Sequence, residues 1–143
     1  MREYYKPKHF LVQELVDPFT YKLLGENSLI CMDIRILKLL DQLRDYFNKP
    51  MHVNDWHVGG LMKSRGFRCP SNPVGANFSQ HRFGRAADFT IDEINSDNVR
   101  EIILANQHLE PFDQITAMEK NITWVHVDIR MTGLPEIKMF DPS

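Results

Sequence analysis

The first third of the chain has the apolar spacing of an amphipathic helix. Four apolar residues recur every three or four positions and so share one helix face: Ile36, Leu40, Leu43 and Phe47. Asp33 is a suitable N-cap, and the helix must end near Asn48 because Pro50 disfavours the helical conformation in the residue before it. These positions predict a helix from 33 to about 48. The apolar residues between positions 10 and 16 predict a short helix or an extended cover.

Two later segments alternate between apolar and polar residues, as half-buried strands do. In residues 86–91, Asp88 lies on the face opposite to most of the apolar side chains. Residues 122–130 form the clearest predicted strand, in which three residues share one face: Trp124, His126 and Asp128. Shorter strands are predicted at 51–56 and 112–118.

The remaining segments complete the predicted architecture. A helix is predicted from a Ser96 cap to about His108, and the tail after Gly133 is expected to be loosely packed. Residues 59–84 are rich in Gly, Pro, Ser and Asn, which predicts a long irregular segment of the kind that is usually functional. Because helices and strands are mixed without a regular βαβ rhythm, we expect an α+β fold in which a small antiparallel sheet packs with helices.

Composition places these elements in a single domain spanning residues 1–143. The net charge of −2 argues against a nucleic-acid partner or an anionic membrane surface, and no apolar run approaches the ~20 residues that cross a bilayer. Cys31 and Cys69 are expected to be free thiols rather than a disulfide or a zinc site. We expect a monomer.

Three residues have the chemistry of a metal site. His81 precedes Asp88 by seven residues, and Gly84 permits a turn that returns the strand to His81. His126 offers a third ligand from the polar face of its strand. Two imidazoles, one carboxylate and an open position are typical of catalytic zinc. The spacing alone is weak, because each residue also fits an ordinary structural role.

Hydrolysis at such a centre requires a base. Glu119 lies seven residues before His126, in the turn expected to lead into its strand, although it also fits a solvated turn residue. Asp128 is the alternative base, but a carboxylate on the ligand's own strand more often orients the imidazole.

Four other side chains have two interpretations each. His57 is either a cleft residue or an ordinary loop histidine, and Trp124 either borders the site or belongs to the core. Arg65 and Arg82 either attract acidic peptides or are solvated.

Two motifs resemble the signature of the zinc D,D-carboxypeptidases: Ser79-x-His81-x-x-Gly84-x-Ala86-x-Asp88 and Trp124-x-His126. This family includes the VanX-type D-Ala-D-Ala dipeptidases, phage L-alanyl-D-glutamate endolysins and the hedgehog signalling domain. The Gly-Phe-Arg sequence at 66–68 is similar to the family's Gly-Tyr-Arg, and residues 112–127 are similar to a subgroup common in phage genomes. The resemblance covers residues 53–130, approximately.

The resemblance implies a hedgehog/D,D-peptidase-like fold with one Zn²⁺ bound by His81, Asp88 and His126. It implies that Glu119 is the general base. Many members instead place the acid three residues before the final histidine, where this chain has Thr123.

Two further roles follow from the same resemblance. Arg68 is expected near the substrate carbonyl or carboxylate, where its guanidinium stabilises negative charge. Ser79 is expected to form a hydrogen bond near the metal.

The function implied is that of a zinc metallopeptidase, from a phage or a bacterium, that hydrolyses peptidoglycan. The D,D-carboxypeptidase and the L-alanyl-D-glutamate endopeptidase types both fit, with a stem peptide or another D-amino-acid peptide as substrate. The alternatives are a non-catalytic binding or virion structural module and a cytoplasmic VanX-type dipeptidase. Residues 1–8 lack the apolar core of a signal peptide, so we expect synthesis in the cytoplasm and action on the cell wall after release or from a virion.

Overall fold

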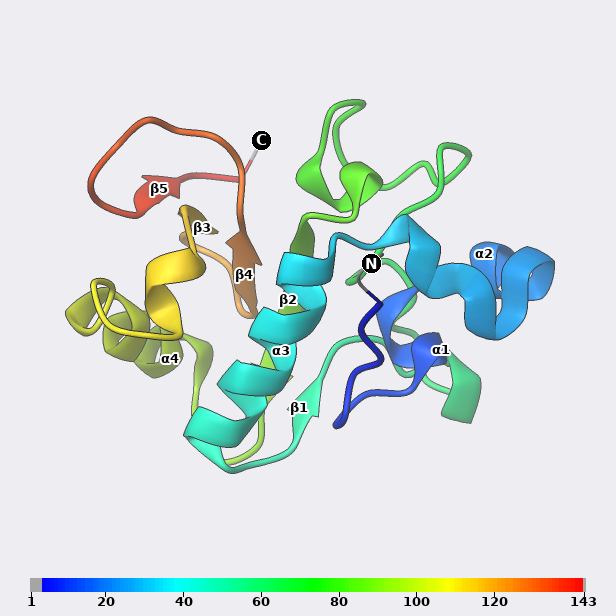
Figure 1. Cartoon of the computed structure of the whole chain (residues 1–143), viewed down its shortest axis with the longest axis horizontal. Helices are drawn as coiled ribbons and strands as arrows, with labels where there is room; N and C mark the ends of the chain where they lie inside the picture. Colours follow the sequence, from blue (N-terminus) through cyan, green and yellow to red (C-terminus); the bar gives the residue numbers. More distant parts are fainter. Residues whose placement is uncertain (1–3, 143) are drawn as a thin grey trace.

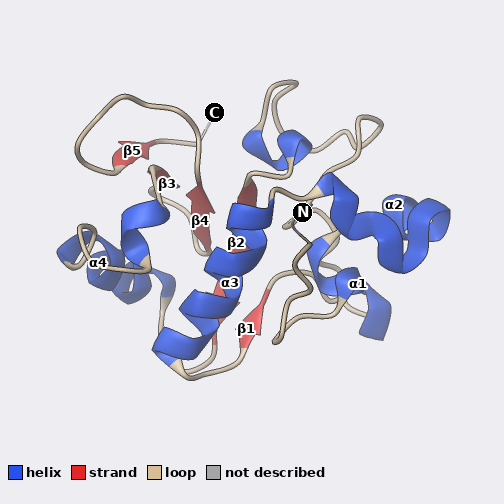
Figure 2. Ribbon diagram, viewed as in Figure 1, coloured by secondary structure: helices blue, strands red, loops and turns tan. Residues whose placement is uncertain are grey.

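A computed structural model describes residues 4–142 and has the predicted α+β architecture (Figures 1 and 2). The α-helices are α1 (Val12–Leu15), α2 (Pro18–Leu24), α3 (Ile34–Phe47) and α4 (Ser96–Ala105). Short 3₁₀ helices are η1 (Gly25–Cys31), η2 (Trp56–Val58), η3 (Gln80–Phe83) and η4 (Phe112–Gln114). The strands are β1 (Met51–His52), β2 (Ala86–Ile91), β3 (Ala117–Glu119), β4 (Val125–Asp128) and β5 (Lys138–Phe140).

The strands form one sheet in the order β1-β2-β4-β3-β5. Its pairs are antiparallel except for β3 with β5, which is parallel, so the sheet is mixed rather than purely antiparallel as expected. The parallel pair exists because the tail returns along the free edge of β3. The tail is therefore paired with the sheet over residues 138–140, and the expectation of loose packing was wrong there.

Helix α3 confirms the predicted amphipathic helix. Asp33 accepts a hydrogen bond from the Arg35 amide at its start, and Asn48 ends it in the left-handed conformation with φ of 50°. The predicted apolar face is buried, and it joins side chains of β2 and β4 in one hydrophobic cluster. Figure 1 shows α3 crossing the centre of the molecule in front of β2. This packing provides a rigid base for the sheet.

Several predicted boundaries were wrong, for local reasons. Asn95 caps α4 in place of Ser96, because the Asn95 side chain accepts from the Asn98 amide. The helix ends at Ala105 rather than near His108, where the Asn106 amide donates to the Ile102 and Ile103 carbonyls. The strand expected over 51–56 stops at His52. The strands expected over 112–118 and 122–130 are shorter, since η4 and the bends at 121–124 interrupt their apolar alternation.

The N-terminal helices position the segment that carries Arg68. The Phe67 amide donates to the Leu15 carbonyl at 2.8 Å, and a Cβ at Gly66 would lie 2.0 Å from that same oxygen. Only glycine permits this approach. The buried Asp17 carboxylate also accepts from the Cys69 amide at 3.0 Å. Residues 66–69 are thereby fixed against α1 and the start of α2.

Two further expectations concern the state of the two cysteines and the absence of a membrane-spanning segment. Cys31 and Cys69 are both free thiols, as expected. Within residues 4–142, no helix has the length and apolar character needed to span a bilayer.

Candidate metal centre

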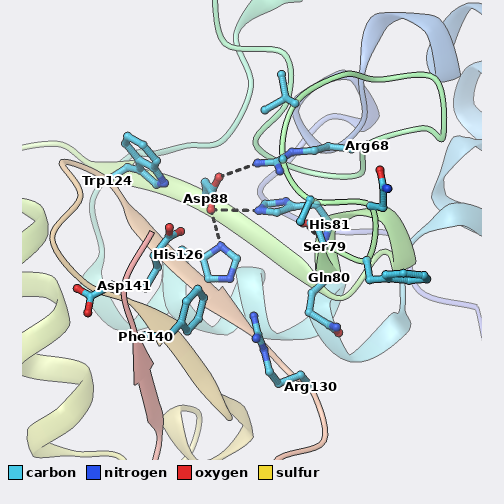
Figure 3. Close-up of a pocket in the computed structure, with 16 residues that line it drawn as sticks. Arg68, Ser79, Gln80, His81, Asp88, Trp124, His126, Arg130, Phe140 and Asp141 are labelled. Atoms are coloured by element: carbon cyan, nitrogen blue, oxygen red, sulfur yellow. Dashed lines mark hydrogen bonds and ion pairs between the residues drawn. The ribbon is translucent and has the colours of Figure 1, made fainter. Parts of the chain in front are cut away.

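His81, Asp88 and His126 converge in the structure (Figure 3). One potential ligand atom from each lies within 4.8 Å of the others, and all three side chains are buried. The β2–β4 register places Asp88 directly opposite His126, so their side chains share a sheet face. Helix η3 supplies His81, and Gly84, with φ of 66°, provides the turn from η3 to β2. The predicted turn at this glycine is therefore present.

The His81 ring is held so that one nitrogen faces the centre. Its Nδ1 lies 2.8 Å from the Gly66 carbonyl, which fixes Nδ1 as the donor. Its Nε2 is buried, lies 3.2 Å from Asp88 Oδ1, and has no hydrogen bond of good geometry in the structure described. A buried nitrogen without a partner is costly, and a metal ion would satisfy it.

His126 is held from the opposite side. Its Nδ1 lies 2.8 Å from Asp88 Oδ1, and its Nε2 lies 2.8 Å from Asp128 Oδ2. Asp128 is itself fully buried and accepts two hydrogen bonds from the Arg130 guanidinium, at 2.8 and 2.6 Å. Asp128 thus occupies the orienting position expected of it, and that contact leaves Nδ1 directed toward Asp88.

The three side chains strongly affect one another's protonation. Burial opposes the charged form of His126, but hydrogen bonds to Asp128 and Asp88 outweigh it and raise the pKa of this imidazole to about 9. Burial would raise the pKa of Asp88, whereas the charge of His81 and the hydrogen bond from His126 hold that pKa well below its usual range. A buried carboxylate that stays ionised beside two imidazoles is a ready ligand for a cation.

The donor set fits a divalent metal ion. Two imidazole nitrogens and one carboxylate oxygen suit zinc and neighbouring transition metals. The His81 Nε2 without a hydrogen-bond partner in the described chain and the Asp128 carboxylate that orients the His126 ring fit the same interpretation. These residues can therefore hold one metal ion.

Arg68 reaches the same carboxylate from the side of the loop. Its Nη2 lies 3.3 Å from Asp88 Oδ2, and its Nε donates to the Ser64 carbonyl at 2.6 Å. Burial lowers the pKa of Arg68, although the Asp88 carboxylate opposes that change. The guanidinium borders the cavity, which is the position from which it could meet a substrate oxygen.

An open cavity of about 500 Å³ lies over the centre and includes Arg68, Ser79 and Trp124 among its lining residues. Ser79 accepts from the His81 amide at 3.4 Å, which places its hydroxyl beside the predicted ligand. Trp124 is half-buried, and its Nε1 lacks a hydrogen-bond partner within the described chain. The structure thus places both predicted residues in the site.

One row of residues crosses the sheet beneath this cavity. Asp88 pairs with His126, and extending the β3–β4 register by one residue places Glu119 level with His126. Glu119 in turn pairs with Phe140 of β5. We call these four residues the sheet wall. Glu119 therefore lies at the end of β3 rather than in a turn, and it borders the cavity beside the candidate ligand.

Residues 74–80 border the opposite side of the cavity, and we call the whole segment 69–80 that contains them the loop wall. The Arg82 guanidinium donates to five carbonyls of this segment, at 2.7 to 3.5 Å: those of Cys69, Pro70, Asn72, Val74 and Ala76. Gly75 packs so closely that a Cβ there would lie 2.5 Å from Arg68 Nη1. Arg82 is therefore not simply solvated, because its donors are committed to the loop.

Some cavity residues were missing from the sequence prediction, and some predicted ones lie elsewhere. The residues missed include Gln80, Arg130, Phe140 and Asp141. Arg130 alone had a usable signal, since it follows Asp128 at the two-residue spacing of one strand face. His57 is not among the lining residues; it packs edge-on against Trp56. Arg65 lies over the Trp124 ring at 6.0 Å.

A buried His-Asp-His group beneath an open cavity defines a candidate metallohydrolase. Comparison with protein families matches residues 9–128 to Peptidase M15, and the chain belongs to this family. No match to a curated protein or to a solved structure was found. Membership confirms the resemblance to the zinc D,D-carboxypeptidases and extends it from residue 53 back to residue 9, so α1, α2 and α3 belong to the family region.

Proposed function

We propose that the protein is a zinc-dependent peptidase that hydrolyses peptide bonds in peptidoglycan. The observation that carries this proposal is the buried His81, Asp88 and His126 group, in which one imidazole nitrogen has no hydrogen-bond partner among residues 4–142. Family membership supports peptidase chemistry. The substrate proposed is a stem peptide or another D-amino-acid peptide of the cell wall, reached after release from the cell or from a virion, by a protein acting as a monomer.

Zinc would be held by His81 Nε2, His126 Nδ1 and Asp88, and when bound it supplies Lewis acidity and an activated water. Glu119 borders the cavity level with His126, which supports a role for its carboxylate as the base that would take a proton from water and return it to the leaving amine. Asp128 keeps His126 oriented through Nε2.

Arg68 has a separate task in this scheme. Its guanidinium is buried, always charged and anchored by the Ser64 carbonyl and Asp88. From the cavity edge it would stabilise the negative charge that develops on the substrate oxygen, which is where preorganised donors contribute most to rate.

The test separates metal binding from catalysis. We expect purified protein to bind one zinc per chain and to cleave muropeptides, with turnover lost on chelation and restored by zinc. His81→Ala should lose the metal, whereas Glu119→Gln should keep it and lose at least 100-fold in kcat. Glu101→Gln, an exposed glutamate on α4, is the matched control and should change neither.

Two results would contradict the proposal. A protein that takes up no zinc and cleaves no muropeptide would favour a binding or virion structural module. Cleavage of free D-Ala-D-Ala without cleavage of sacculi would favour a VanX-type dipeptidase instead.

A further inference from the structure

Two cavity residues have polar groups that the protein leaves unpaired. Gln80 Oε1 is buried and has no hydrogen-bond partner in the described structure. Arg130 uses Nε and Nη2 on Asp128, and no other described residue accepts from its Nη1. Both residues line the cavity over the metal centre. In the view of Figure 3 both lie on the far side of His126 from Trp124.

The Arg130 guanidinium is fixed before any ligand arrives. Asp128 holds one edge through two hydrogen bonds, and the Phe140 ring lies 4.5 Å from the guanidinium carbon. Its side chain keeps 29% of its surface exposed, so the remaining edge is open. A guanidinium held this way loses little conformational entropy when it binds an anion.

Arg130 and Phe140 both lie outside the region that the family match covers. The match ends at residue 128, whereas β5 spans residues 138–140 and reaches the cavity by pairing with β3. Arg130 and Phe140 therefore lie just beyond the matched residues, whereas Gln80 lies within them.

The local charges favour a carboxylate bound through directed hydrogen bonds. Asp128 neutralises the charge of Arg130 but leaves the two Nη1 protons free, and guanidinium edges match carboxylates geometrically. Three carboxylates line the cavity, and among the described residues none of them accepts a hydrogen bond from Arg130. Asp88 belongs to the candidate metal centre, Glu119 is the proposed base, and Asp141 accepts from Asn121 at 2.6 Å. Gln80 Oε1 accepts hydrogen bonds but is covered in the structure, so it would meet an amide N–H of the same ligand after its side chain rotates into the cavity that it lines.

We propose that Gln80 and Arg130 form a subsite that binds one residue of the peptide substrate, Arg130 through its carboxylate and Gln80 through its amide N–H. The inference rests on the proposed peptidase function and specifies the substrate as a peptide with a carboxylate beside the scissile bond. That carboxylate is either the chain terminus or an acidic side chain. The first source corresponds to a carboxypeptidase and the second to an endopeptidase.

The experiment compares matched peptides on the zinc-loaded full chain. One pair of N-acetyl-D-alanyl-D-alanine peptides ends in a free carboxylate or in a carboxamide. A second pair, with amidated ends, places D-glutamate or D-glutamine beside the bond to be cut. Wild type should prefer the acidic member of one pair by about tenfold in kcat/KM, as expected for a hydrogen bond to a charged group. The pair that shows the preference identifies the source of the carboxylate.

Variants assign the preference to the two residues. Arg130→Gln should abolish the preference, and Arg130→Lys should restore part of it. Gln80→Ala should weaken both members of a pair alike and leave their ratio unchanged. Arg85→Gln, an exposed arginine outside the cavity lining, is the control and should keep the wild-type ratio. Because the readout is a ratio, any general loss of fold or metal in the Arg130 variants cancels.

Binding to Glu119→Gln, measured by calorimetry, separates this inference from the proposed function. Cleavage without preference for either acidic peptide, or a preference that survives in Arg130→Gln, overturns the subsite and leaves the peptidase function standing. Absence of cleavage together with tighter binding of the acidic peptide overturns the function and supports the subsite.

Discussion

The two walls of the cavity are built by different means. In the sheet wall, the register of four strands places Asp88, His126, Glu119 and Phe140 in one row, and backbone ladders hold them. The loop wall, residues 69–80, has no ladder and depends on the Arg82 guanidinium for five of its carbonyl contacts. The first arrangement spreads its support over many backbone bonds, whereas the second concentrates it in one side chain.

This difference matches the tasks of the two walls. Metal ligands and the base must keep fixed distances, which a sheet packed on α3 provides. A substrate must enter and leave, and a loop that stays irregular tolerates such movement. The loop wall also presents Phe78 at the cavity with 82% of its surface exposed. In the proposed function, the sheet wall would serve the chemistry and the loop wall the substrate.

The largest effect is expected from changing the support of the sheet wall with Asp128→Asn. Loss of the carboxylate removes one cause of the raised pKa of His126, so in metal-free protein that pKa should fall from about 9, as measured by NMR titration. Zinc affinity in chelator competition should fall 10–100-fold, because His126 loses its orienting partner. Easier deprotonation of His126 offsets part of that loss.

Asp92→Asn provides the matched control for that change. Asp92 pairs with the exposed His52 at 2.8 Å on the surface, so its loss should alter neither the His126 titration nor zinc affinity. An unchanged His126 pKa in Asp128→Asn would contradict the contact assigned to Nε2.

Much of the sheet wall could be predicted because the patterns that position Asp88 and His126 lie within short segments of the sequence. Strand alternation placed Asp88 and His126 on polar faces, and a seven-residue spacing with Gly84 brought His81 back to the strand. Glu119 was selected as a candidate but placed in a turn, since a three-residue strand carries too little pattern to be recognised. The register that sets it level with His126 depends on pairing between strands, which one sequence does not display.

The remaining parts depend on long-range contacts. The sequence of Lys138–Phe140 has no pattern that predicts a parallel strand pair, yet this segment pairs with the free edge of β3. Arg82 lies within the family motif, but the motif assigns it no role. Its five acceptors are backbone carbonyls, which every residue has, so the sequence does not reveal them. Contacts to backbone leave no trace in the identity of the partner residue.

A smaller effect, confined to substrate binding, is expected from Arg82→Met. Without the guanidinium the loop wall should lose its fixed shape, raising KM about tenfold while zinc affinity stays at the wild-type value. Arg82→Lys should rescue little, because one ammonium cannot reach five carbonyls. Arg85→Met on the neighbouring surface is the control and should leave KM unchanged. Loss of zinc in Arg82→Met would show that the two walls are not independent.

The smallest effect is expected where the tail completes the sheet wall. Phe140 packs edge-on against His126, at 5.6 Å between ring centroids, and stacks beneath Arg130. Phe140→Ala should cost about 1 kcal/mol in the free energy of unfolding and lower zinc affinity only severalfold, since Asp128 still orients His126. Phe140→Leu keeps the apolar contact without the ring face, so it separates packing from the aromatic contribution. Zinc affinity in Phe140→Ala that falls as far as in Asp128→Asn would show that the tail, and not the hydrogen bond from Asp128, holds the ligand in place.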